Sequence, residues 1–400
     1  MRVAPAAICN RTRDTVAPMN TLTQDIVLLL GAGFSADADL PVMGKFGQQK
    51  QPRLAQDRRP WIAKFANAAR TYESFRKHCI DRGALSIDRA DNIEDVFSLA
   101  EVLAEAGHAP LPLGGANQEC RDVVADIKLW IWKVYHQLPF YNKSERKPKD
   151  HTYDGFFALI NELQLSQRIA VITTNYDIVF EWKAWQHDLC CSYPVSSTHD
   201  FRVSSGEGRF IAPIIGCPRP VIPVYKLHGS INYFTLADGG DDVQVAGDIT
   251  ERGGRVLNTG TTPDRPAIMY IEALEAVSRR YSDQLMPAIV PPTYAKLGHG
   301  RWLESIWNGA LNALKHARLV VAIGYSMPDS DGFMKALIKA AIATRHSNEP
   351  PQLRIINDDP DVHTRFCKAF GKDLVIKTDP KRLDEALPEL LPRLFESVRG

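Results

Sequence analysis

The sequence predicts an α/β protein in which a parallel sheet carries helices on both faces and a large all-helical insertion follows the first strand. Two observations support this fold class. Short apolar runs of strand length alternate with helical segments from residue 168 onward, a pattern typical of parallel sheets with crossover helices. Between the first such run, Asp25 to Leu30, and that second half, the apolar periodicity is helical.

The first predicted strand ends on a glycine turn, Gly31-Ala32-Gly33. Gly31 lets the chain turn, Gly33 lets the backbone approach a pyrophosphate, and Ala36 allows close packing of helix against strand. Such a turn is weak evidence alone, because many α/β proteins turn on glycine without binding a nucleotide. A dehydrogenase needs an acidic residue at the end of a second strand about twenty positions later. Residues 45–60 are polar, basic and interrupted by proline instead, which argues against hydride transfer.

The insertion is predicted to contain three amphipathic helices, at Trp61 to Ile80, Asn92 to Ala106 and Asn117 to Leu138. Asp91 stands three positions before Glu94, which has the form of a capping box at the start of the second helix. We therefore interpret Glu94 as a cap rather than a catalytic residue.

The α/β pattern returns after the insertion. The predicted strands are Arg168 to Thr173, Val221 to Leu227, Met286 to Val290, Arg318 to Ile323, Leu353 to Ile356 and Leu374 to Lys377, with a helix at Gly300 to Lys315. Polar or glycine residues follow several of these runs directly. Open parallel sheets bind ligands at the carboxyl ends of their strands, so the sequence predicts a binding site at that edge.

The candidate site residues lie at these strand ends. They are Thr174, Asn175 and Asp177 after one strand, His228 after the next, then Gly324 and Ser326, and Asn357. Each has a structural alternative. Asn175, Asp177 and Ser326 could cap helices, His228 could be a core histidine in a turn, and Asn357 could belong to a turn. Their joint placement behind a glycine turn favours a site.

Composition limits the function further. The 400 residues carry 48 basic and 47 acidic side chains, and this balance gives no general attraction to nucleic acid. No apolar stretch approaches the ~18 residues of a membrane span, so we expect a soluble, cytoplasmic protein. The seven cysteines include no C-x-x-C pair, which excludes a zinc ribbon, and their odd count argues against a disulfide framework.

The ordered motifs resemble those of sirtuin-like (silent information regulator-like) domains over residues 25–378. The matching segments are Gly31-Ala32-Gly33-Phe34-Ser35 with Leu40-Pro41, Thr174-Asn175-Tyr176-Asp177, Leu227-His228-Gly229-Ser230, Gly324-Tyr325-Ser326 and Ile356-Asn357. The resemblance implies a Rossmann-like sheet that binds NAD+ as a substrate, without a metal. We also expect one domain over residues 21–400 with its helical insertion at 45–150, and a flexible leader at residues 1–20, because that segment is polar.

The chain departs from the deacetylase pattern at several positions. The zinc ribbon is missing, Val42-Met43-Gly44 replaces a Phe-Arg element, and Thr174 stands where glutamine is usual. Ile231 to Phe234 replaces the Phe-Gly-Glu element that lines an acyl-lysine tunnel. With these departures, the chain resembles the bacterial anti-phage defence branch, whose members hydrolyse NAD+.

The resemblance also implies residue roles. Asn175 would orient the ribose and the attacking water, His228 would act as general base, and Asp177 would hold the nicotinamide carboxamide. Phe34 would be a lid over the nicotinamide ring or plain packing. The implied cofactor-binding set is Gly31, Ala32, Gly33, Phe34, Ser35, Thr174, Gly324, Ser326 and Asn357.

The implied function is an NAD+ hydrolase that releases nicotinamide and ADP-ribose and depletes NAD+ in abortive infection. Such an activity needs gating, so we expect a homo-oligomer that assembles with a HerA-like ATPase or, alternatively, an Argonaute-like protein. Trp61, Trp130 and Trp132 of the insertion would suit an interface or its core. Two alternatives stay open: an NAD+ or ADP-ribose sensor without turnover, and an NAD+-dependent protein deacylase or ADP-ribosyltransferase.

Overall fold

The computed structural model describes residues 24–36, 38, 40, 46, 60–136, 150–193, 208–210, 221–236, 244–245, 249–251, 285–291, 301–328, 331–345, 349–376 and 381–397. The predicted leader, the predicted start of the insertion at residue 45 and the segment Val42 to Gly44 lie outside the described residues.

A six-stranded sheet with the order β13-β12-β1-β4-β7-β5 forms the centre of the protein, and all its strand pairs are parallel. Its strands are β1 (Ile26–Leu30), β4 (Ile169–Thr173), β5 (Cys190–Ser192), β7 (Val221–Lys226), β12 (Leu319–Ile323) and β13 (Gln352–Ile356). Every side chain of β1, β4 and β12 is buried, as expected for strands covered on both faces. The structure confirms the predicted Rossmann-like sheet.

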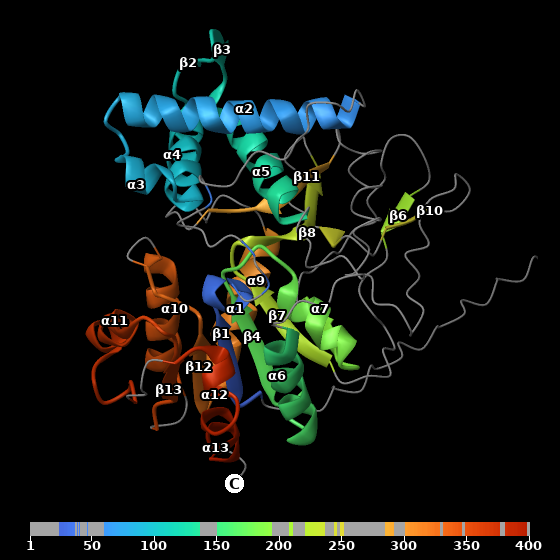
Figure 1. Cartoon of the computed structure of the whole chain (residues 1–400), viewed down its shortest axis with the longest axis vertical. Helices are drawn as coiled ribbons and strands as arrows, with labels where there is room; N and C mark the ends of the chain where they lie inside the picture. The colour runs from blue at the N-terminus through green and yellow to red at the C-terminus, as the bar shows by residue number, and fades with distance from the viewer. Residues whose placement is uncertain are drawn as a thin grey trace, which may run out of the picture.

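Helices flank this sheet on both faces (Figure 1). They are α1 (Ala32–Ala36), α6 (Asp150–Glu162), α7 (Val179–Gln186), α9 (Arg301–His316), α10 (Gly332–Ala343), α11 (Pro360–Phe370), α12 (Leu383–Ala386) and α13 (Leu390–Glu396). The helix predicted at Gly300 to Lys315 is α9. The strand predicted at Leu374 to Lys377 is reduced to one bridge between Val375 and Leu353.

The region after β1 is mainly helical, as predicted, and lies as a separate layer beyond one end of the sheet (Figure 1). Its elements are α2 (Pro60–Asp81), α3 (Ile87–Ala90), α4 (Ile93–Glu105) and α5 (Cys120–His136), with a short hairpin of β2 (Leu111–Leu113) and β3 (Ala116–Gln118). The hairpin was not expected from the helical periodicity. It joins α4 to α5 and buries Leu111 and Leu113 on one face.

The predicted capping box at the start of α4 is wrong in its cap residue. Asn92 is the N-cap, and its side-chain oxygen accepts from the Glu94 N–H at 3.0 Å. Asp91 instead ends α3 and pairs with Arg76. Because a neighbouring asparagine can satisfy the same helix end, the spacing alone did not separate the two.

A second, antiparallel sheet lies between the insertion and the central sheet. It has the order β11-β8-β9, with β8 at Gly229–Leu236, β9 at Gln244–Val245 and β11 at Leu285–Ile289. The strand predicted at Met286 to Val290 therefore exists but does not join the parallel sheet. A further pair joins β6 (Gly208–Phe210) to β10 (Ile249–Glu251).

The insertion tryptophans are packing residues in this structure. The Trp132 indole donates to the Ile231 carbonyl of β8 at 2.8 Å and stacks on Phe65, with ring centroids 5.5 Å apart. Trp130 is 2% exposed. Both therefore belong to the core rather than to an outer interface, while the Trp61 side chain lies outside the described part.

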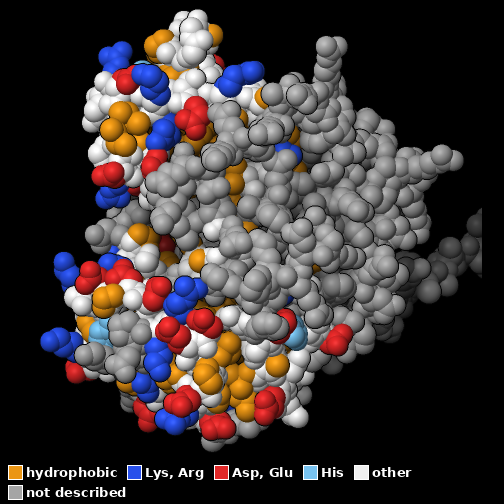
Figure 2. Space-filling view, in the orientation of Figure 1, with side chains coloured by type: hydrophobic (Ala, Val, Ile, Leu, Met, Phe, Trp, Pro, Cys, Tyr) orange, Lys and Arg blue, Asp and Glu red, His pale blue; other side chains and the backbone are white. Residues whose placement is uncertain are grey.

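Among the described residues, no helix is long and apolar enough to cross a membrane. The visible face of the described part carries acidic and basic side chains side by side (Figure 2), in keeping with the net charge of +1.

Candidate functional site

A cavity of about 510 Å³ opens at the carboxyl edge of the central sheet. Four strand ends line it: Ala32, Gly33 and Ala36 after β1; Thr174 and Asn175 after β4; Ile323, Gly324, Tyr325, Ser326 and Pro328 of β12 and beyond; and Ile356, Asn357, Asp358 and Asp359 of β13 and beyond. In the sheet, β4 lies on one side of β1, and β12 and β13 lie on the other side. The cavity therefore lies at the topological switch point, where open α/β sheets bind ligands.

The floor of the cavity is a close contact between the turns after β1 and β12. The Gly33 N–H donates to the Gly324 carbonyl at 2.9 Å, and the Phe34 N–H donates to the Gly31 carbonyl at 2.9 Å. A Cβ at Gly33 would lie 2.7 Å from Gly324 Cα, and one at Gly31 would lie 2.7 Å from the Gly324 carbonyl oxygen. The absence of side chains therefore lets the two strand ends meet. Gly33 was expected to admit a pyrophosphate, yet here its N–H is occupied by protein backbone.

Asn175 lines the cavity and also holds the glycine turn. Its side-chain amide donates to the Gly31 carbonyl at 2.9 Å and to Ser35 Oγ at 3.1 Å. Ser35 Oγ in turn donates to Asp177 Oδ1 at 3.0 Å. The same Asp177 oxygen accepts from the Val179 N–H, so Asp177 caps α7. A buried hydrogen-bonded chain thus runs from the turn to the β4–α7 loop.

Two buried charged side chains hold the β4–α7 loop in place. Lys226, at the end of β7, pairs with Glu181 at 3.0 Å, and both side chains are 1% exposed. The Lys226 ammonium also donates to the carbonyls of Asn175 and Asp177. Burial raises the pKa of the Asp177 carboxyl, and Lys226 opposes that shift. The β4–α7 loop that carries Asn175 is therefore fixed in two ways. The Asp177 carboxylate accepts hydrogen bonds within it, and the Lys226 ammonium binds its backbone carbonyls.

His228 is buried directly after β7 and packs against Tyr176. It is 1% exposed, and the two ring centroids lie 6.3 Å apart in an edge-on arrangement. Its carbonyl accepts from the Val290 N–H at 2.9 Å, and Gly229 follows with a positive φ of 75°. His228 does not line the cavity.

Phe34 lies in the aromatic core rather than over the cavity. Its ring meets those of Tyr153, Phe156 and Phe180 at centroid distances of 5.3, 5.9 and 6.1 Å. Its carbonyl accepts from the Tyr153 hydroxyl at 2.6 Å. These contacts correspond to the packing interpretation of this residue.

The predicted site residues thus divide into two groups in the structure. Those that line the cavity are Ala32, Gly33, Thr174, Asn175, Gly324, Ser326 and Asn357. Those that lie outside the lining are Gly31, Phe34, Ser35, Asp177 and His228, and all of them are buried in the surrounding protein.

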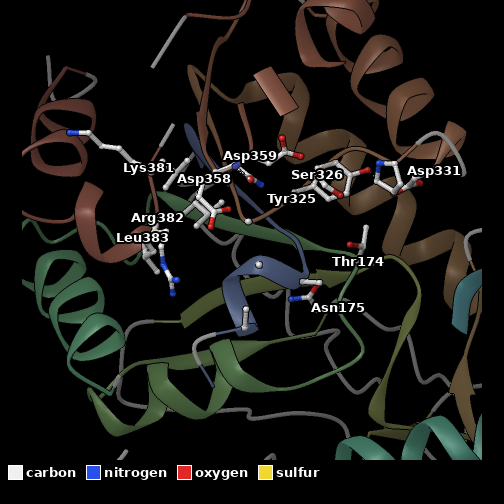
Figure 3. Close-up of a pocket in the computed structure, with 18 of the residues that line it drawn as sticks. Thr174, Asn175, Tyr325, Ser326, Asp331, Asp358, Asp359, Lys381, Arg382 and Leu383 are labelled. Carbon is white, nitrogen blue, oxygen red and sulfur yellow. Dashed lines mark hydrogen bonds between the residues drawn. The ribbon is translucent and has the colours of Figure 1, made fainter. Parts of the chain in front are cut away.

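The cavity also has walls that sequence reasoning did not assign. Figure 3 shows Lys381 and Arg382 on one side, where β13 ends, and Tyr325 and Asp331 on the other. Asp331 accepts from the Tyr325 hydroxyl at 2.7 Å and caps α10. Lys381 donates its backbone N–H to the Asn357 carbonyl at 3.0 Å. No strand pattern marks these positions in the sequence.

Asn92 and Glu94 at the start of α4 complete the lining from the insertion. Their only sequence signal was the helix-cap pattern, which pointed to a structural role. Within the described ranges, no group of three or more His, Cys, Asp or Glu side chains could hold a metal ion.

No family model and no curated protein matches the chain. Solved structures of Sir2 proteins are similar at low identity. A Sir2 homologue in complex with NAD is 12% identical, with a TM-score of 0.37, over 95% of this chain and 93% of that chain. A structure concerned with the mechanism and regulation of Sir2 enzymes is 13% identical, with a TM-score of 0.38 and 94% coverage of both chains. Similarity at this level assigns no function to the chain.

Proposed function

We propose that this protein is an NAD+ hydrolase that cleaves the bond between nicotinamide and ribose and releases ADP-ribose. The observation that carries the proposal is the cavity at the switch point, where the glycine turn and the Asn175 amide meet. Its volume of about 510 Å³ is in the range of small-molecule and cofactor sites. The series of five motifs, which stand in order at five strand ends, adds the expectation of a dinucleotide.

The charges around the cavity favour one direction for the dinucleotide. Lys381 and Arg382 would attract the pyrophosphate and adenosine ribose toward the end of β13, where Asn357 also lies. The nicotinamide ribose would then lie at Asn175. This orientation places the scissile bond over the glycine turn.

Cleavage passes through an oxocarbenium-like state, so the site has to orient the ribose and an attacking water. In the proposal, Asn175 does this through its amide, which is already fixed by Gly31 and Ser35. Ser35 and Asp177 support that amide from below. His228 is the proposed general base, because imidazole is the side chain that most often takes this role in proteins.

The position of His228 leads us to propose that the hydrolase activity is gated. Because the His228 side chain is buried and does not line the cavity, turnover requires the turn between β7 and β8 or the neighbouring Tyr176 side chain to move. We propose that assembly, as a homo-oligomer with a HerA-like ATPase or an Argonaute-like partner, accelerates this step during anti-phage defence, and that the purified chain alone keeps a lower, basal rate of release. Depletion of NAD+ would then be confined to infected cells.

A sensor that binds NAD+ or ADP-ribose without turnover is the second candidate. The burial of His228 favours it, because a binding module needs the cavity but no exposed base. The two candidates share the binding step and differ only in nicotinamide release.

The test measures nicotinamide release from NAD+ and ADP-ribose binding by the purified full-length chain. We expect His228→Ala to lower release by about 10² or more and to leave ADP-ribose affinity unchanged, because a general base contributes to the chemical step. Asn175→Ala should lower both quantities, because its amide also holds the turn. His316→Ala, on the exposed end of α9, is the matched control and should change neither.

The outcomes separate the candidates. Release that His228→Ala abolishes supports the hydrolase. Binding of ADP-ribose without release contradicts unassisted hydrolysis and supports the sensor. Absence of ADP-ribose binding by the wild-type chain contradicts both.

A further inference from the structure

Arg365 of α11 connects two strand ends that line the cavity. Its Nε–H donates to the Ser326 carbonyl at 2.9 Å, and its Nη2 group donates to Asp359 Oδ2 at 2.8 Å. Ser326 follows β12 and Asp359 follows β13, and Figure 3 shows both in the lining. Arg365 itself does not line the cavity. Its guanidinium therefore joins the two strand ends without occupying the space between them.

The backbone after β12 needs such a contact. Met327 has a φ of 51°, a left-handed conformation that residues other than glycine rarely adopt. A conformation of this kind persists only where the surrounding structure holds it. The Ser326 carbonyl belongs to the peptide bond that enters Met327, so the hydrogen bond from Arg365 fixes the orientation of that peptide. The path of the lining segment after β12 thus depends on Arg365.

On the side of β13, Arg365 acts through Asp359. The hydrogen bond from Arg365 holds the pKa of the Asp359 carboxyl below its ordinary value of 3.8. Asp359 also caps α11, because its Oδ1 accepts from the Asp361 N–H at 2.9 Å. The Asp359 backbone N–H donates to Asn357 Oδ1 at 3.0 Å. Arg365 is therefore linked to Asn357, a proposed ligand-binding residue, by one intervening side chain.

The packing of α11 does not depend on Arg365 alone. The next residue, Phe366, is buried and meets the Tyr325 ring edge-on, with ring centroids 6.3 Å apart. This contact remains when Arg365 is replaced. A lysine at position 365 would keep the positive charge, but its ammonium lacks the planar fork that donates to two acceptors in a fixed geometry. Arginine and lysine therefore separate a geometric role from an electrostatic one.

We propose that Arg365 is a positioning residue for ligand binding, whose guanidinium fixes the strand ends of β12 and β13 so that the adenosine end of the ligand fits between them. The inference rests on the proposed function, because it takes an adenine dinucleotide as the ligand. Lys381 and Arg382 attract the ligand by their charge in that proposal. Arg365 acts instead by holding the shape of the lining.

The experiment measures the affinities of ADP-ribose and AMP for the purified chain by isothermal titration calorimetry. Arg365→Lys should weaken both ligands about tenfold, because both carry the adenosine end. Arg365→Met, which also removes the charge, should weaken them to the same extent. Nicotinamide release should show a KM that rises about tenfold and a kcat within about twofold of wild type, since the scissile bond lies at the other end of the ligand.

Arg393→Lys is the matched control. Arg393 lies on α13, is exposed, and belongs to a helix that supplies no residue to the cavity. The same substitution there should leave both affinities unchanged. Thermal unfolding should give nearly the same midpoint for the two lysine variants, because Phe366 keeps α11 in place.

The remaining outcomes overturn defined claims. Unchanged ADP-ribose affinity in Arg365→Lys overturns the positioning role. Affinity that Arg365→Lys keeps and Arg365→Met loses assigns Arg365 an electrostatic role and also overturns it. A loss for ADP-ribose without a loss for AMP overturns the assignment to the adenosine end.

Failure of the proposed function gives a different result. If wild-type protein binds neither ligand, the dinucleotide site is wrong, and the inference falls with the proposed function. If wild-type protein binds ADP-ribose but releases no nicotinamide, unassisted hydrolysis is wrong, and the two affinities still decide the role of Arg365.

Discussion

The two halves of the cavity edge are built in different ways. Between β1 and β12, backbone meets backbone: Gly31, Gly33 and Gly324 allow the turns to touch. The Gly31 and Gly33 N–H groups donate to the Ile323 and Gly324 carbonyls across this contact. Between β4 and β7, buried side chains set the geometry, with Lys226 and Glu181 paired beneath the β4–α7 loop. One half depends on the absence of side chains and the other on the presence of charged ones.

This difference shows what the motif residues do. The glycines define the shape of the cavity floor, whereas Asp177 and Ser35 hold Asn175 from behind. Several residues that motif reasoning assigns to the ligand are therefore supports in this structure. Substitutions in the two halves should therefore destabilise the protein for different physical reasons.

The largest effect is expected in the charged half. Lys226→Met removes one partner of a buried ion pair. It leaves the Glu181 carboxylate without its counter-ion and takes the ammonium donor from two loop carbonyls. Breaking a buried pair in this way costs about 3–5 kcal/mol. Urea unfolding should show this loss of unfolding free energy.

An exposed pair provides the control for that measurement. Lys77→Met breaks the pair with Asp81 on the surface of α2 and should cost at most about 1 kcal/mol. Equal losses in the two variants would mean that Lys226 does not hold the loop.

The glycine half should respond to a single added methyl group. Gly324 has a φ of 61°, and a Cβ there would lie 2.6 Å from Gly33 Cα. Gly324→Ala therefore combines left-handed strain with overpacking, and about 3 kcal/mol of destabilisation is expected. Gly107 has a φ of 64° with nothing within 4 Å, so Gly107→Ala should cost only about 1 kcal/mol. Similar unfolding free energies for the two variants would show that the close approach of the turns is not required.

The sequence predicted the parallel sheet well because its strands are continuous apolar runs. Such a run is a local property that buried strands require, and β1, β4, β7, β12 and β13 all lie where the runs predicted. The short β5 and the strand β8 were missed. Cys190 to Ser192 is too short to give a pattern, and β8 follows β7 with only Leu227 and His228 between them.

The candidate site was predicted less completely, because lining a cavity depends on contacts between distant segments. Asn175 and Asp177 are two residues apart and look equivalent in the sequence, yet one lines the cavity and the other caps α7. Glu94 reaches the site only because the insertion folds over the sheet edge. No local pattern encodes either fact.

The smallest expected effect is a pH dependence of the unfolding free energy. It tests whether Asp177 is a buried structural carboxyl or a ligand-binding one. Burial raises the pKa of this carboxyl above its ordinary value of 3.8, so the folded state binds the proton more tightly than the unfolded state. Its contribution to stability is then fully present below pH 3.8 and is lost as pH rises through the folded pKa. Asp177→Asn cannot titrate, but its side-chain oxygen can still accept from Ser35 and Val179. Unfolding free energies measured across pH should therefore show wild type losing stability relative to Asp177→Asn as pH rises. A difference that stays constant with pH would mean that burial does not raise the pKa of the Asp177 carboxyl in the folded protein.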